Sequence, residues 1–138
     1  MGFDKEVEMV RIANKMDLFS IVYVASPEDA RQMAEAGADA IISHVGTTVG
    51  GSIGVTGASC SMDDAIARTN EIVAAAKAVN PDLFFLAHGG PINTPEDVRI
   101  ILDQADVHGF VGASSLERMG VEESLTNLTR EFKKLTIN

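Results

Sequence analysis

Short apolar runs alternate with amphipathic segments along most of the chain, which is the pattern of a parallel α/β protein. The apolar runs are rich in β-branched and aromatic residues, as in buried strands. They lie at residues 19–25, 39–45, 83–88 and 107–113. Helical spacing marks the segments 3–16, 26–37, 61–79 and 94–105, and a last helix follows a short turn at 114–118. We therefore expect parallel strands joined by right-handed helical crossovers.

The predicted helices carry clear start and stop signals. Ser26 and Ser61 are N-cap residues, with Asp64 three positions after Ser61, and Gly37 is a natural C-cap. The start Ser26-Pro-Glu-Asp-Ala-Arg31 is echoed by Thr94-Pro-Glu-Asp-Val-Arg99, and each copy stands between two strands at similar distances. The echo indicates two β-α-β pairs in series.

Apolar stripes predict which face of each helix is buried. In the first helix the stripe comprises Met9, Ile12, Ala13 and Met16; in the helix after residue 94 it comprises Val98, Ile101, Leu102 and Ala105; and in the last helix it comprises Leu125, Leu128, Phe132 and Leu135.

Four consecutive βα units make half of an eightfold (β/α) barrel, which needs about 250 residues. The chain has 138 residues, and we expect residues 1–138 to form a single half-barrel domain. Continuous apolar strands require cover on both faces, so a half barrel leaves its inner face bare. We expect a second copy, or another chain that supplies the missing half barrel, to close the ring. The alternative is a self-contained four-stranded sheet with helices rewound over both faces.

The composition of the chain limits the classes of partner that it can bind. The net charge is −9, which repels nucleic acid and anionic membrane surfaces, so we expect neither as a partner. No apolar run is long enough to cross a bilayer, and the N-terminus has no signal-peptide pattern. The single cysteine, Cys60, forms no intrachain disulfide, so a cytoplasmic location is expected.

Two glycine-rich turns follow adjacent strands near the C-terminus. One contains Gly89 and Gly90, and the other contains the segment 112–115. Glycine lets backbone N–H groups approach a ligand closely, and loops after the last barrel strands commonly hold phosphate. We therefore expect a small anionic metabolite to bind there. The candidate ligands are Gly89, Gly90, Gly112, Ala113, Ser114 and Ser115, with Arg118 as the nearest cation.

Two histidines end neighbouring predicted strands, where barrel active sites lie. His44 and His88 are candidates for proton transfer, and Glu117 is the best carboxylate near the anion site. His108 starts its strand at the opposite rim, which favours a structural role. No acidic cluster stands at a strand end, so no metal site is predicted, and the sequence identifies no cofactor.

The segment 46–61 has five glycines and no charged residue. Loops of this length inside a compact domain usually serve a function. It is not a P-loop, because no Gly-Lys-Ser/Thr sequence follows. It is not a dinucleotide fingerprint, because the spacing of its glycines is wrong. It could fold over a bound ligand as a lid, with Gly46, Gly50, Gly51 and Ser52 as contacts.

Five motifs in order resemble the phosphoenolpyruvate hydrolase-like family of TIM-barrel signal transduction proteins. They are Glu6-Val-Glu-Met-Val-Arg11, Ala36-Gly-Ala-Asp39, Gly50-Gly-Ser-Ile-Gly54, His88-Gly-Gly-Pro91 and Gly112-Ala-Ser-Ser-Leu-Glu-Arg118. The resemblance implies a TIM barrel about twice as long as this chain and a hydrolase-like activity.

Two functional classes follow. The first is an enzyme that acts on a small phosphorylated or carboxylated metabolite, with a hydrolase as the candidate reaction type. The second is a non-catalytic ligand-sensing or signal transduction module, or an inactive fragment of a longer barrel.

Overall fold

The computed structural model describes residues 2–47, 49, 60–117 and 119–134. Its centre is a four-stranded parallel sheet in the order β1-β2-β3-β4. The strands are β1 (Ile21–Val24), β2 (Ala40–His44), β3 (Phe84–His88) and β4 (Gly109–Phe110). This arrangement confirms the predicted consecutive βα units. The first and last strands are shorter than the runs 19–25 and 107–113 that predicted them.

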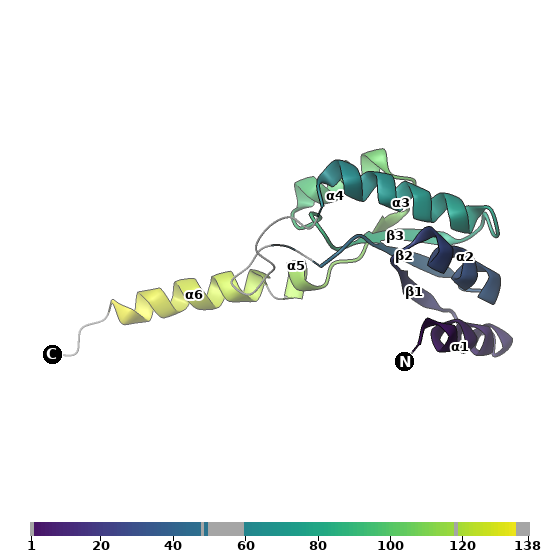
Figure 1. Cartoon of the computed structure of the whole chain (residues 1–138). Helices are drawn as coiled ribbons and strands as arrows, with labels where there is room; N and C mark the ends of the chain where they lie inside the picture. Colours follow the sequence, from purple (N-terminus) through teal and green to yellow (C-terminus); the bar gives the residue numbers. More distant parts are fainter. Residues whose placement is uncertain (1, 48, 50–59, 118, 135–138) are drawn as a thin grey trace.

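Six helices accompany the strands in the described residues (Figure 1). They are α1 (Phe3–Lys15), α2 (Pro27–Ala36), α3 (Met62–Lys77), α4 (Pro95–Gln104), α5 (Ser114–Glu117) and α6 (Met119–Lys133). The predicted helix caps are present. The Ser26 side chain accepts the Asp29 N–H at the start of α2, and Gly37 ends α2 in the left-handed region at φ 89°. Ser61 and Thr94 form capping boxes with Asp64 and Asp97.

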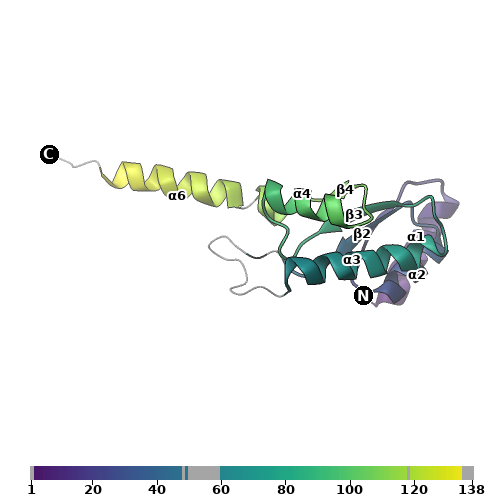
Figure 2. The same cartoon turned by 90° about the horizontal axis from the view of Figure 1, so that it is seen from above.

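Helices α2, α3 and α4 cover one face of the sheet (Figure 2). On that face the strands contribute in-register side chains, including Val22, Ile41 and Phe85. Ile41 and Phe85 are fully buried against α2 and α3. The second cluster joins Ala87 to Ile101 of α4. The helices therefore lie as they do outside a barrel, and the alternative with helices wound over both faces is wrong.

The opposite face is the one that would line the inside of a barrel. Because side chains alternate along a strand, Ile21, Tyr23 and Phe84 lie there, and all three are exposed. The inner face without helical cover that the sequence predicted is thus present, with Ala40 and Ile42 buried at its centre and the larger side chains around them exposed. No helix in the described part of the chain is both long and apolar enough to span a membrane.

The predicted buried face of α1 is wrong, and that of α4 holds for Val98, Ile101 and Ala105 but not for Leu102. In α1 the buried side chains are Val7 and Val10, whereas Met9, Ile12 and Met16 are exposed. Helix α1 packs against α2 through a face rotated from the predicted stripe, and part of that stripe borders a groove instead. In α4, Leu102 of the predicted stripe is also exposed.

The last helix differs most from its prediction. Helix α6 extends away from the sheet (Figures 1 and 2). Leu125, Leu128 and Phe132 were expected to be buried, and all are exposed because no sheet lies beneath them. Leu135 lies outside the described residues.

Candidate functional site

Three aromatic rings gather on the uncovered face at the carboxyl ends of β1, β2 and β3. The register pairs His44 with His88, and their ring centroids lie 5.2 Å apart. Tyr23 of β1 meets both rings edge-on, at 5.9 Å from His44 and 5.2 Å from His88. We call these three residues the Tyr-His cluster. The two histidines were predicted to meet here. Tyr23 was not predicted as part of the site. It pairs in register with Ile42, which lies two residues before His44 on the same face of the sheet, and this register could have indicated it.

His88 is held in one orientation by the neighbouring strand. Its ring is 9% exposed, and Nδ1 lies 2.7 Å from the carbonyl oxygen of Val111. A carbonyl oxygen can only accept, so Nδ1 carries the proton. When His88 is neutral, its Nε2 is therefore a hydrogen-bond acceptor and a base.

His44 has the opposite tautomer. Its Nδ1 accepts the backbone N–H of Gly46 at 3.3 Å, so the proton of the neutral ring is on Nε2. Burial lowers the pKa of His44, and the nearby charges of His88 and Arg68 lower it further. The neutral pair thus offers one ring N–H donor, on His44, and one ring nitrogen acceptor, on His88.

The first glycine turn lies directly beside the cluster. The Gly90 N–H donates to the carbonyl oxygen of Gly46 at 2.8 Å, which extends the pairing of β2 and β3 beyond the strands. Gly89 has φ 82°, and a Cβ there would stand 2.3 Å from the same oxygen. Only glycine fits this position. The amide of Gly90 is therefore engaged, whereas the Gly89 N–H has no partner among the described residues.

The second glycine turn follows β4. Its backbone is joined to the cluster through Val111, which accepts the His88 hydrogen bond. The segment Gly112–Ser115 is half-buried, and α5 begins at Ser114. A Cβ on Gly112 would stand 2.5 Å from the side chain of Leu116, so close packing requires glycine here. The structure thus places both turns at the carboxyl edge of the sheet.

The sequence did not predict the cationic side chain that lies at this edge of the sheet. Arg68, on the second turn of α3, donates to the carbonyl oxygen of Ala25 at 3.4 Å, just beyond the end of β1. Its charge also lowers the pKa of His44. Nothing local to Arg68 in sequence indicates this, because the contact spans 43 residues.

The remaining candidates are less closely joined to the cluster. Glu117 is exposed at the end of α5, and the structure shows no contact between it and either histidine. Gly50, Gly51, Ser52 and Arg118 lie outside the described residues. His108 accepts the Phe85 N–H at 3.0 Å, at the amino end of β4, which agrees with its predicted structural role.

Metal-binding side chains do not gather in the described part of the chain, where no three His, Cys, Asp or Glu residues stand close enough to hold an ion. Cys60 donates to the carbonyl oxygen of Val45 at 3.4 Å, beside the first glycine turn.

The fold and the position of the cluster define a class. The chain is a parallel run of βα units of the TIM-barrel type, with its polar site at the carboxyl edge. Its structure is similar to the N-acetylmannosamine-6-phosphate 2-epimerase from Clostridium perfringens, with TM-score 0.54 and 15% identity. The match covers 88% of this chain and 48% of the epimerase, which is about half of that protein.

The family follows from sequence similarity. A profile of the phosphoenolpyruvate hydrolase-like family matches residues 1–135, and the chain belongs to that family. Two tomato (Solanum lycopersicum) proteins are each 41% identical over 138 residues: ToMV susceptible protein tm-1(GCR26) and ToMV resistance protein Tm-1(GCR237). Each match covers 99% of this chain, which spans only 18% of either tomato protein.

Proposed function

We propose that this chain binds a small phosphorylated or carboxylated metabolite at the Tyr-His cluster and transfers protons to and from it, as a hydrolase of its family would. The observation that carries the proposal is the pair of opposite tautomers of His44 and His88, with ring centroids 5.2 Å apart. A base beside a hydrogen-bond donor can take a proton from an attacking water while the donor stabilises the charge that develops on a substrate oxygen.

The surroundings suit an anion. Gly89 contributes an amide without a partner among the described residues, and Arg68 supplies positive charge at the same edge. Guanidinium groups bind phosphate and carboxylate bidentately. The amides of Ala113 and Ser114 and the hydroxyls of Ser114 and Ser115 in the second turn are further donors within the proposal.

In a phosphate ester hydrolysis, His88 would be the base and His44 a hydrogen-bond donor. Water attacks phosphorus and gives its proton to Nε2 of His88. As the ester P–O bond breaks, the leaving oxygen accepts a hydrogen bond from the Nε2–H of His44 and then takes the proton that His88 holds. The lowered pKa of His44 favours the neutral ring that makes this hydrogen bond. Glu117 and Arg118 stay candidates for a part in this site.

The second candidate function is ligand sensing without turnover. It is favoured by the openness of the cluster, since Tyr23 is 47% exposed on a sheet face that nothing in the described chain covers. An open site binds but does not exclude water from the reacting atoms.

The test titrates inorganic phosphate and phosphoenolpyruvate into the protein, while the histidine ring signals are followed by NMR and phosphate release is assayed. We expect the His44 and His88 signals to shift, and Arg68→Gln to weaken binding about tenfold, in line with the loss of a charge-assisted contact. Arg99→Gln is the matched control, because Arg99 is exposed on α4 and pairs only loosely with Asp103 at 4.0 Å.

Turnover separates the two functions. The enzyme hypothesis predicts that His88→Asn and His44→Gln bind the anion but release no phosphate. The control variant His108→Asn should stay active. Binding without release in the native protein supports sensing. If neither anion moves the two histidine signals at millimolar concentration, the proposed site is wrong.

A further inference from the structure

Helix α6 carries an exposed apolar stripe along one of its faces. Its members Val121, Leu125, Leu128 and Phe132 are 54%, 60%, 55% and 63% exposed. They follow one another at intervals of four, three and four residues. This alternation is the spacing that keeps apolar side chains in the seam between two packed helices. The stripe therefore has the pattern of a surface that another helix covers.

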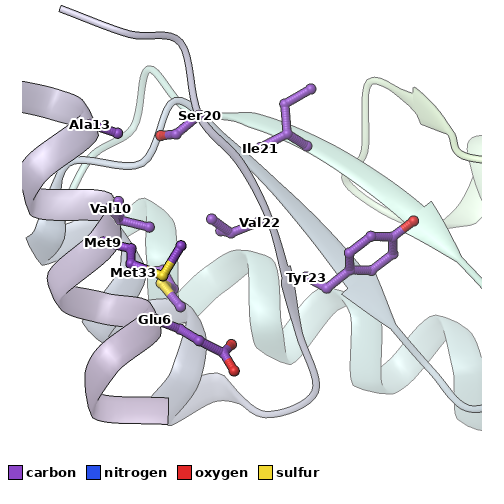
Figure 3. A pocket seen from close by; sticks show the side chains of 9 residues that line it. All are labelled: Glu6, Met9, Val10, Ala13, Ser20, Ile21, Val22, Tyr23 and Met33. Carbon is purple, nitrogen blue, oxygen red and sulfur yellow. The ribbon is translucent and has the colours of Figure 1, made fainter. Parts of the chain in front are cut away.

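The described part of the chain offers α6 little support. The helix extends away from the sheet and packs mainly against the short α5 (Figures 1 and 2). The exposed apolar side chains of α1 differ, since Met9 and Ala13 line a groove of about 390 Å³ against Ile21 and Val22 of β1 (Figure 3). An isolated helix of 15 residues is marginal in water, because most helical stability comes from packing of an apolar face. A partner surface would supply that packing to α6.

Charge is segregated along α6. Glu122 and Glu123 lie near its N-terminus, whereas Arg130 and Lys133 lie in its last turn. The described residues 119–134 contain three acidic and three basic side chains, so their net charge is zero. The net charge of −9 thus belongs entirely to the rest of the chain. Two copies of α6 can approach one another without the repulsion that two copies of the whole surface would have.

The charges favour one direction of pairing. In an antiparallel pair, the acidic end of each helix lies beside the basic end of the other, and the two helix dipoles are opposed. In a parallel pair, like charges lie together and repel one another. An antiparallel pair of α6 helices is therefore electrostatically complementary to itself.

The stripe also matches its own reverse. Val121 and Phe132 are centred on the same point of the helix as Leu125 and Leu128, between residues 126 and 127. A two-fold axis at this point sets Val121 of each copy opposite Phe132 of the other, and Leu125 opposite Leu128. Such self-complementarity is what a symmetric dimer requires. In this register Glu122 of one copy comes within one helical turn of Lys133 of the other, on the same side of the stripe.

We propose that α6 is a dimerisation helix, which pairs antiparallel with α6 of a second copy of this chain through the apolar stripe. This pairing leaves the sheet face and the sheet edges free, so it differs from closure of a ring by two copies. It also does not depend on the anion site. The contact is small, because a helix of 15 residues spans only about 22 Å. We therefore expect a dissociation constant in the micromolar range, as for weak and transient interfaces.

Sedimentation velocity over a concentration series from micromolar to millimolar tests the dimer. Leu125→Glu should raise the dissociation constant about tenfold or more, because it places a charge at the centre of the pair. Thr126→Glu is the matched control, since it adds the same charge at the neighbouring position off the stripe, and it should change the constant little. Both side chains are exposed, so both variants should fold, which circular dichroism checks.

Cysteine cross-linking tests the direction of the pair. In a Cys60→Ser background, a mixture of Val121→Cys chains and Phe132→Cys chains should form a disulfide between the two variants under mild oxidation. Neither variant should cross-link with itself, because two copies of either position lie about 16 Å apart along an antiparallel pair. A disulfide needs Cα atoms within about 7 Å. In a parallel pair, each variant would cross-link with itself instead.

Three results would overturn the proposal. The first is a chain that stays monomeric at millimolar concentration. The second is a dimer that Leu125→Glu leaves intact, since another surface would then form the contact. The third is self-cross-linking of the single cysteine variants, which would exclude the antiparallel pair. Anion binding is read on the histidine signals and dimerisation on sedimentation, so either this proposal or the proposed function can fail alone.

Discussion

The hydroxyl of Ser43 on β2 lies 3.1 Å from that of Thr69 on α3, and both side chains are fully buried. This hydrogen bond fixes β2 to the helix layer. Because side chains alternate along a strand, a Ser43 that faces α3 sets His44 on the opposite, uncovered face. The bond therefore helps to define the register on which the Tyr-His cluster depends.

Removal of either hydroxyl should destabilise the fold. Ser43→Ala and Thr69→Val each leave one buried hydroxyl unpaired, which costs about 1–3 kcal/mol. The double variant should lose less than the sum, with a coupling of at least about 0.5 kcal/mol. Urea unfolding of the four proteins measures this. Strict additivity would show that the two hydroxyls do not stabilise one another.

Gly89→Ala should be strongly destabilising. The residue has φ 82°, and the new Cβ would stand 2.3 Å from a backbone oxygen that cannot move without disturbing the pairing of β2 and β3. We expect a loss of at least about 1–3 kcal/mol, the range for strained backbone positions. Gly120→Ala on α6 is the control, because a Cβ there meets nothing within 4 Å. Equal thermal stability of the two variants would contradict the geometry.

Stability should fall in acid partly through His44. Its pKa is lower in the folded protein than in the unfolded chain, because burial and its charged neighbours disfavour the imidazolium. The unfolded state then binds the proton more readily. The resulting stability is complete above the ordinary histidine pKa and is lost as the pH falls through the folded value.

The check on this prediction is the pH dependence of urea unfolding between pH 8 and pH 5. His44→Gln should have a smaller loss of stability over this interval than the native protein. A His44→Gln slope as steep as the native one would mean that another group dominates.

The cap of α4 offers a local test. The Thr94 hydroxyl accepts the Asp97 N–H at 3.2 Å, and the Asp97 carboxylate accepts the Thr94 N–H at 2.9 Å. Thr94→Ala should cost about 1 kcal/mol, as loss of an N-cap does. Thr126→Ala, on the exposed surface of α6, should change the free energy of unfolding little. Thermal unfolding of both variants compares them directly.

Local signals predicted the elements well. Ser26, Ser61 and Thr94 begin helices because their side chains bond the free N–H groups of the first turn, which depends only on neighbouring residues. The meeting of His44 and His88 was also predictable, since strand ends of a parallel sheet share an edge.

Long-range packing was not predictable in the same way. Helix α1 buries Val7 and Val10 rather than Met9, Ile12 and Met16, because its neighbours are α2 on one side and an open groove on the other. Arg68 reaches Ala25 across 43 residues, and no periodicity carries that information. The stripe on α6 is apolar as predicted, but no surface in the described residues buries it.

The segment between β2 and α3 is attached at both of its ends to the same strand termini. The Val49 N–H donates to Gly90 O at 3.3 Å, and Cys60 returns to Val45 O. Those two anchors fix the separation of the ends whatever lies between them. Insertions, deletions or new sequence between the two anchors should therefore leave the histidines in place.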